Sequence, residues 1–248
     1  MRKPGIYLSP SKQPKNTYAV GNTNEEKEMV AVSKIIRDIL EKEYGYGVQL
    51  ATLSLEIGSG GRPKEAKEKK CGIYLAIHSN AGGKGKAQGA VALYHPKSGE
   101  SKLLGQYLAE ELNRICPYKS NRAQTLVNGM DAFNGKGYGE IRVPFENGMI
   151  PVLMETNFHD HPGIARWIID HKPEIARAYV DGIVKFLGLG STVEVQKVVQ
   201  VSEDKKVESE DEEKFYRVQV GAFRKKENAE VLVSRLYNEG FDGFIKYS

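Results

Sequence analysis

One acidic residue stands at the end of a short apolar segment, where a catalytic group could be held. Glu155 follows an apolar run within residues 151–162, whose sequence is PVLMETNFHDHP. An apolar stretch of this length between prolines predicts a buried strand. Ligands of open α/β sheets bind just beyond the carboxyl ends of the strands. We therefore expect Glu155 at a strand tip with His159 and His161 in the loop above it, although a buried, hydrogen-bonded structural glutamate fits the same pattern.

A second segment of the same design ends in a histidine. Residues 71–81, CGIYLAIHSNA, predict another buried strand that carries His78 near its end. Glu25 opens a segment with helical spacing of apolar residues. Histidine nitrogen and carboxylate oxygen are zinc ligands, and a catalytic zinc site keeps one position for water. These residue types predict a hydrolytic zinc site in which Glu25 and His78 bind the metal and Glu155 is the general base.

Strand and helix patterns alternate through the first three quarters of the chain. Further strands are predicted at residues 5–8, 47–53 and 90–94, and helices at 25–44, 101–115, 162–171 and 173–187, with a short basic helix within 59–70. Residues 129–148 are rich in Gly and Asn and predict a loop. This alternation predicts an α/β fold, a three-layer αβα domain with a mostly parallel sheet.

The composition limits the class of protein. The chain has 248 residues and 40% hydrophobic content, enough for one sizeable domain and a small module. No apolar run is long enough to cross a bilayer, and no secretory signal pattern precedes the first strand, so we expect synthesis in the cytoplasm. The spacing of Cys71 and Cys116 suggests neither a disulfide framework nor a zinc ribbon, so reduced thiols are expected.

Charge divides the chain. Residues 194–214 contain eight acidic residues and four lysines, a net charge of −4. Because the whole chain has a net charge of +4, the remaining residues carry a net charge of +8. This basic excess fits a polyanion such as a cell wall, whereas no zinc-finger or aromatic RNA-binding signature points to nucleic acid. We predict a catalytic domain at 1–190, a charged linker at 191–214, and a small β-α-β module at 215–248. A module of this size is expected to form a homodimer or to dock on the first domain.

Three motifs resemble a known enzyme family. GNTNE at 21–25, AIHSNA at 76–81 and VLMETNFHDHP at 152–162 are similar to the zinc-dependent N-acetylmuramoyl-L-alanine amidases, in the branch common among endolysins of phages that infect Gram-positive bacteria. The resemblance spans most of residues 5–188. It implies that Zn²⁺ is the cofactor and that the amide between N-acetylmuramic acid and L-alanine of peptidoglycan is cut. Residues 215–248 resemble the first half of a SPOR-type peptidoglycan-binding repeat.

The resemblance assigns functions to individual residues, with one departure. It implies Glu25 and His78 as zinc ligands and Glu155 as the catalytic glutamate; a shift of one residue would replace Glu25 by Glu26. Most of the family has a histidine ligand in the loop after the first strand, but here that loop, SPSKQPKNTY, has none. We expect His159 to be the third ligand, with Gln13 as a weaker donor nearer to the family position.

Two alternatives to an amidase remain. A protein that has lost a zinc ligand would bind peptidoglycan without cutting it, and a zinc peptidase would cut within the stem peptide by the same chemistry. The set of Glu25, His78 and Glu155 favours the amidase, because a binding protein needs no general base. We expect a phage endolysin, with a sporulation enzyme as the other setting. The remaining histidines are expected to have structural or supporting positions: His95, His161 and His171.

Overall fold

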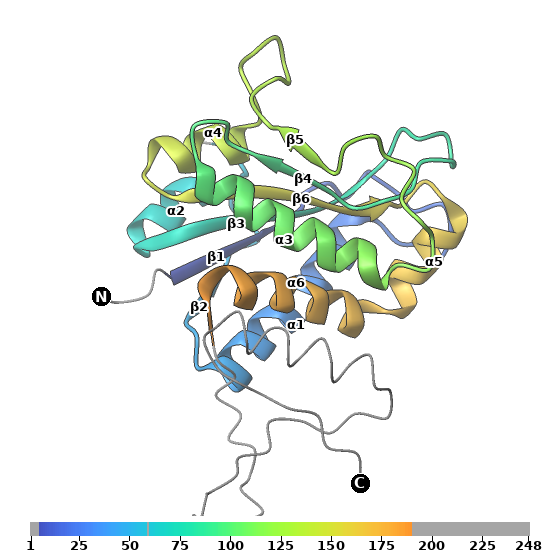
Figure 1. Ribbon diagram of the computed structural model, residues 1–248, viewed down its shortest axis with the longest axis horizontal. Coiled ribbons are helices and arrows are strands. Elements are labelled where there is room, and N and C mark those ends of the chain that lie inside the picture. Colours follow the sequence, from blue (N-terminus) through green and yellow to red (C-terminus); the bar gives the residue numbers. More distant parts are fainter. Residues whose placement is uncertain (1–4, 59, 190–248) are drawn as a thin grey trace, which may run out of the picture. The chain divides into compact units, whose positions relative to one another are not determined.

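Six strands form one mixed sheet in the part of the chain that the structure describes, which is residues 5–58 and 60–189 of a computed structural model (Figure 1). The strands are β1 Gly5–Pro10, β2 Val48–Leu50, β3 Cys71–Asn80, β4 Val91–Tyr94, β5 Leu126–Asn128 and β6 Ile150–Phe158. They lie in the order β2-β1-β3-β6-β4-β5. Neighbouring strands are parallel except for β4 and β6, which are antiparallel.

Helices cover both faces of this sheet (Figure 1). They are α1 Glu25–Tyr44, α2 Arg62–Glu68, α3 Gly99–Ile115, α4 Gly139–Glu146, α5 Pro162–Asp170 and α6 Lys172–Leu187. Ile73, Leu75 and Ile77 of β3 share one core with α1, α3, α5 and α6. Tyr74 and Ala76 share a second core with α2 and α4. The predicted three-layer α/β fold with a mostly parallel sheet is therefore confirmed.

The two helical layers differ in size. On one face α1, α3 and α6 have 20, 17 and 16 residues, whereas on the other α2 and α4 have seven and eight. A short helix spans little of the sheet at 1.5 Å per residue. The face covered by α2 and α4 therefore leaves room for a pocket at the ends of the strands.

The start of α1 is fixed by its cap. The side chain of Asn24 accepts a hydrogen bond from the backbone N of Lys27 at 2.9 Å, which satisfies one of the free N–H groups at the helix start. Three glutamates lie in the first turn, where negative charge is favoured by the helix dipole. The sequence predicted this helix at the same residues, 25–44, because both the cap and the apolar spacing are local signals.

One prediction of local structure is wrong. Residues 139–146 lie inside the segment expected to be a loop, but they form α4. Pro144 lies inside this helix, and the flanking segment is rich in glycine, so the helical pattern is obscured. Ile141 and Val143 are nevertheless buried, and this packing stabilises the helix. β5 was also missed, because three residues are too few to show alternation.

The predicted linker at 191–214 and the predicted module at 215–248 lie outside the described residues. Within the described part, Cys71 is half-buried and Cys116 is buried, and both are free thiols. Of the helices described, none combines the length and apolar character needed to span a bilayer.

Candidate active site

His78 lies at the centre of a buried charged cluster. Its Nδ1 is 3.0 Å from Oε1 of Glu25 and its Nε2 is 2.9 Å from Oε2 of Glu140. All three residues are at least 95% buried, with exposures of 5%, 1% and 4% for His78, Glu25 and Glu140. Burial by itself lowers the pKa of His78, but the hydrogen bonds to Glu140 and Glu25 outweigh burial and raise that pKa to about 10. In this arrangement both ring nitrogens therefore donate to carboxylates.

Two neighbouring strands place His78 beside Glu155. The two residues are register partners in the parallel pair of β3 and β6. Side chains at paired positions point to the same face of a sheet. The expectation that two strands bring a histidine and a glutamate to one edge is thus confirmed by the register.

Glu155 has a free carboxylate oxygen. Its Oε2 is buried and has no hydrogen-bond partner among the described residues. Burial raises the pKa of Glu155 to about 7; the His78 imidazolium opposes this shift, and the negative charges of Glu25 and Glu140 reinforce it. A carboxyl group that titrates near neutrality can both accept and donate a proton during a reaction.

Glu140 joins this cluster in the structure, although the sequence patterns did not point to it. Glu140 lies in the first turn of α4, in the segment expected to be a loop. Its Oε1 accepts hydrogen bonds from Ser9 Oγ at 2.7 Å and from Tyr74 OH at 2.9 Å. A helical pattern at 139–146 was the signal that could have pointed to this residue, and Pro144 obscures that pattern.

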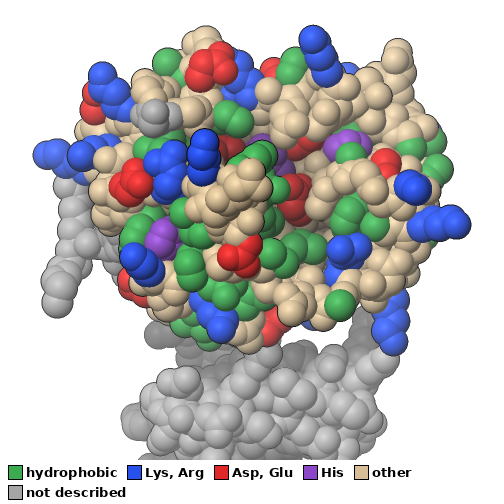
Figure 2. All heavy atoms as spheres, turned by 90° about the horizontal axis from the view of Figure 1, so that it is seen from above, with side chains coloured by type: hydrophobic (Ala, Val, Ile, Leu, Met, Phe, Trp, Pro, Cys, Tyr) green, Lys and Arg blue, Asp and Glu red, His purple; other side chains and the backbone are tan. Residues whose placement is uncertain are grey.

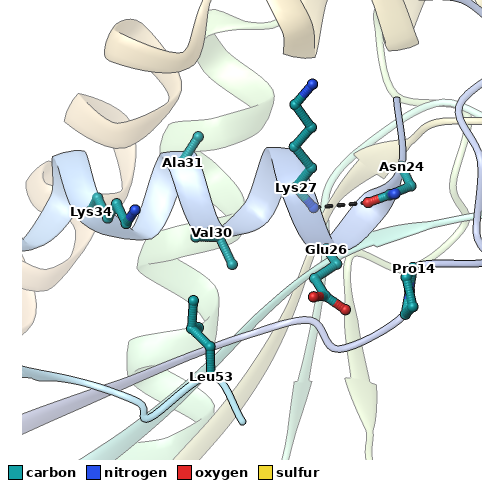
Figure 3. A pocket seen from close by; sticks show the side chains of 8 residues that line it. All are labelled: Pro14, Asn24, Glu26, Lys27, Val30, Ala31, Lys34 and Leu53. Carbon is teal, nitrogen blue, oxygen red and sulfur yellow. Dashed lines mark hydrogen bonds between the residues drawn. The ribbon is translucent and has the colours of Figure 1, made fainter. Parts of the chain in front are cut away.

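Helix α1 directs Glu25 rather than Glu26 to His78. Oε2 of Glu25 also accepts a hydrogen bond from Nδ2 of Asn16 at 2.8 Å. Burial acts to raise the pKa of Glu25, but the hydrogen bond with His78 and its positive charge outweigh burial and lower it. Glu26 instead lines a different groove, together with Pro14 and Asn24 (Figure 3). The structure therefore favours Glu25 in the choice between the two residues.

Gln13 contacts the same side of His78 as Glu25. Its Nε2 is 3.3 Å from Nδ1 of His78. Its Oε1 accepts a hydrogen bond from Nδ2 of Asn16 at 2.7 Å, so Asn16 joins Gln13 to Glu25. Glu25, Gln13 and Nδ1 of His78 thus converge from α1, the loop after β1 and strand β3.

The structure places His159 elsewhere. Its Nδ1 is 2.9 Å from Oγ of Ser79, and its ring stacks on Tyr18 with centroids 4.8 Å apart. Ser79 follows His78 in β3, so the two side chains point to opposite faces of the sheet. Among the described residues, no hydrogen bond joins His159 to Glu25 or His78. Of the two residues predicted as a third ligand, it is Gln13 that contacts the His78 cluster.

The other histidines make local contacts. His161 is the N-cap of α5, and its side chain accepts a backbone N–H of the first turn. His95 stacks on Phe145 with ring centroids 3.6 Å apart. His171 lies 3.5 Å from Glu174, measured from Nδ1 to Oε1. None of these contacts reaches the His78 cluster, so their predicted structural positions fit the geometry.

A pocket of about 660 Å³ opens onto the cluster. Its lining includes the polar residues described above and an aromatic rim: Gln13, Asn16, Glu25, His78, Glu140, Glu155, Phe133 and Tyr138. Phe133 is 65% exposed and contacts Tyr138 edge-on. On the face drawn in Figure 2, acidic and histidine side chains are visible near the middle, with Lys and Arg side chains around them. The pocket therefore combines buried charged groups with an apolar rim, as ligand sites generally do.

Acidic, histidine and cysteine side chains alone do not supply the three protein donors that a catalytic zinc ion usually has. No group of three or more such residues is arranged to hold a metal within residues 5–58 and 60–189. Glu25 and His78 are two donors whose Oε1 and Nδ1 atoms lie 3.0 Å apart. The remaining candidate is the amide oxygen of Gln13, which here accepts a hydrogen bond from Asn16 while the amide nitrogen faces His78. Three protein ligands and one open position are the usual composition of a catalytic zinc site.

An α/β domain with a titratable carboxylate and an imidazole at its strand ends has the groups that hydrolytic enzymes use for acid–base chemistry in a strand-end pocket. A family profile of N-acetylmuramoyl-L-alanine amidases matches residues 6–185. The chain belongs to this family and is an amidase that acts on peptidoglycan. A SPOR domain profile matches residues 207–248, beginning within the predicted linker.

Relatives support this assignment along the whole chain. The sporulation-specific N-acetylmuramoyl-L-alanine amidase of Bacillus subtilis (strain 168) is 25% identical over 246 residues, covering 97% of this chain and 83% of the relative. The N-acetylmuramoyl-L-alanine amidase CwlM of Bacillus licheniformis is 24% identical over 248 residues, covering 98% and 84%.

Solved structures show the same fold. The CwlD amidase from Clostridioides difficile, solved in complex with the GerS lipoprotein, has a TM-score of 0.61 at 21% identity, covering 75% of this chain and 99% of that one. The catalytic domain of the amidase CwlV from Bacillus (Paenibacillus) polymyxa var. colistinus has a TM-score of 0.58 at 18% identity, covering 76% and 100%.

Proposed function

We propose that the chain hydrolyses the amide between N-acetylmuramic acid and L-alanine with a zinc ion held beside His78 and with Glu155 as the general base. The observation that supports this mechanism is the free Oε2 of Glu155, in the same pocket as His78 and Glu25. Both oxygens of Glu25 and of Glu140 already accept hydrogen bonds. Glu155 is thus the carboxylate of the pocket that is free to take a proton.

The donors of the pocket fit a zinc ion, on which enzymes of this family commonly depend. Glu25 offers a carboxylate oxygen, and His78 offers Nδ1 once that nitrogen loses its proton. Gln13 would have to offer its amide oxygen, which in this structure accepts a hydrogen bond from Asn16. A bound zinc ion supplies Lewis-acid chemistry, since it polarises the scissile carbonyl and lowers the pKa of water.

Glu155 moves the proton in both halves of the reaction. Its free oxygen takes a proton from the attacking water, whose oxygen bonds to the carbonyl carbon of the muramoyl group. The protonated Glu155 then donates to the nitrogen of L-alanine as the C–N bond breaks. The products are a carboxylic acid on the sugar side and an amine on the stem peptide, and the acid then loses its proton to the amine or to solvent. The pKa of Glu155 near 7 suits both of its proton transfers.

A digest of purified Gram-positive cell walls with the full chain tests this proposal. We expect new amino groups on L-alanine without new reducing sugars, lost with a chelator and restored by zinc. New amino groups on other stem-peptide residues would instead identify a peptidase. Digestion that is unaffected by chelator would refute the zinc mechanism while leaving the amidase assignment in place.

The alternative is a protein that binds the wall without cutting it. The observation that favours it is the absence of a histidine in the loop after β1, where Gln13 is a weak zinc donor. In the digest, this alternative predicts that the protein sediments with the walls and releases no new ends at any zinc concentration.

The C-terminal residues suggest how the enzyme is held on its substrate. The SPOR match supports peptidoglycan binding by residues 207–248. Dimerisation through 215–248, synthesis in the cytoplasm and the phage endolysin setting stay predictions. The name of the Bacillus subtilis relative includes sporulation, so the timing of expression, in sporulating cells or during phage lysis, is the measurement that separates the two settings.

A further inference from the structure

Glu140 is held in the pocket by hydrogen bonds to both of its carboxylate oxygens. One oxygen accepts from His78 Nε2 at 2.9 Å, and the other accepts from Ser9 Oγ at 2.7 Å and Tyr74 OH at 2.9 Å. Ser9 and Tyr74 are fully buried and Glu140 is 4% exposed. Three partners from β1 and β3 therefore fix the position of this carboxylate against the sheet.

A buried arginine extends this network. Arg62 of α2 is 1% exposed. Its Nη1 donates to Ser9 Oγ at 3.2 Å and to the backbone carbonyl of Pro10. The guanidinium charge is thus separated from the Glu140 carboxylate by a single hydroxyl group. A buried carboxylate beside a buried cation costs less free energy than either charge alone, so Arg62 helps to keep Glu140 in place.

We infer that Glu140 is a positioning residue for the metal site, an inference that rests on the proposed zinc-dependent function. Glu140 accepts the Nε2–H of His78, which fixes the rotation of the ring and keeps the proton on Nε2. Nδ1 then faces Glu25 and Gln13, at 3.0 and 3.3 Å. Metal-binding histidines generally donate their second ring N–H to such a partner, and removing that partner weakens metal affinity by about 10- to 100-fold.

The hydrogen bonds of Glu140 distinguish it from a general base. Both oxygens of Glu140 are occupied, and neither is free to take a proton from water. Glu155, by contrast, has a free oxygen. Substitutions of Glu140 are therefore expected to act through the zinc affinity, whereas substitutions of Glu155 act through turnover.

The test is the zinc affinity of the full chain, measured by competition with a chromophoric chelator. Glu140→Gln preserves the shape and removes the charge, and we expect about 10- to 100-fold weaker zinc binding. Tyr74→Phe removes one donor to Glu140, and we expect a smaller loss. Tyr179→Phe is the matched control, because Tyr179 is also fully buried but bonds to Thr156 on the other face; its zinc affinity should equal that of the wild type.

A double-substitution cycle separates positioning from general stability. If Tyr74 acts through Glu140, Tyr74→Phe has no further effect on zinc affinity in the Glu140→Gln background. Unchanged zinc affinity in folded Glu140→Gln would overturn this inference alone, whereas a wild-type chain that binds no zinc would overturn the proposed zinc mechanism as well. If Glu140→Gln does not fold, Ser9→Ala and Tyr74→Phe decide the matter, and wild-type affinity in both contradicts the inference.

Discussion

Two histidines at the ends of neighbouring strands have opposite environments. His78 contacts two carboxylates, and these bonds raise its pKa to about 10 despite its burial. His159 contacts a serine hydroxyl and a tyrosine ring, and burial lowers its pKa. Both are at least 95% buried, at 5% and 1% exposure. Burial alone therefore does not identify the reactive histidine; the charge of its partners does.

The difference follows from the two faces of the sheet. Side chains of consecutive strand residues point to opposite faces, so His78 and Ser79 separate, as do Glu155 and Thr156. On the side of the short helices, the strand ends meet carboxylates and a pocket. On the other side, Thr156 Oγ1 donates to the carbonyl of His78 at 2.8 Å and bonds to the hydroxyl of Tyr179 at 2.7 Å. At these strand ends, one face of the sheet carries the candidate catalytic residues and the other face carries buried hydrogen bonds that stabilise the fold.

The largest expected effect comes from removing the imidazole on the pocket side. His78→Ala removes a metal donor and leaves Glu25, Glu140 and Glu155 without the cation between them. We expect loss of both zinc binding and wall hydrolysis, measured by chelator competition and by release of L-alanine amino groups. Wild-type hydrolysis by folded His78→Ala would refute the site.

Glu155→Gln tests the residue of β6 that is paired with His78 of β3. The amide cannot take a proton from water, so turnover should fall by about 10²- to 10⁴-fold. Zinc affinity should be retained, because Glu155 is not among the proposed donors. Wild-type turnover in this variant would contradict the proposed mechanism. Loss of zinc binding would instead indicate that Glu155 is a metal ligand and not the general base.

Gln13→His sharpens the comparison by restoring the type of donor that most of the family has in this loop. Neutral imidazole is a better zinc donor than a carboxamide, so zinc affinity should rise, on the order of tenfold or about 1.4 kcal/mol. The matched variant Gln13→Ala should weaken binding. Equal zinc affinities for the wild type and both variants would show that Gln13 is not the third donor.

The smallest expected effect lies on the opposite face. Burial lowers the pKa of His159 below its ordinary value of 6.5, so below that pH the unfolded chain binds a proton that the native protein does not. The unfolding free energy should therefore fall as the pH drops from 6.5 toward the lower native pKa. The His159→Gln variant has no imidazole at this position, so its unfolding free energy lacks this pH dependence. The difference in unfolding free energy between the wild type and the variant should therefore become smaller as the pH decreases.

Denaturant unfolding of the wild type and His159→Gln between about pH 8 and pH 5 measures this difference. The zinc affinity of the variant provides the decisive control. We expect it to equal that of the wild type, because His159 contacts Ser79 and Tyr18. Loss of zinc binding in His159→Gln would instead support the ligand assignment predicted from the sequence.

The sequence by itself determined the elements that hold the main residues. Apolar runs predicted the strands that end near His78 and Glu155, and the Asn24 cap with its apolar spacing predicted the helix that begins at Glu25. These signals are local, since strand and helix periodicity act over a few residues. The three motifs that resemble the amidases are local in the same sense, so the family could also be inferred from the sequence.

Only the tertiary structure decided which side chains meet. Glu140 bonds to His78 across 62 residues and to Ser9 across 131 residues, and such contacts depend on the order of the strands and on the packing of α4. His159 is close to Glu155 in the sequence, yet it turns to the other face, where Ser79 and Tyr18 hold it. Sequence proximity does not determine the face on which a side chain lies once a strand has ended. The sheet and the helices packed on it do.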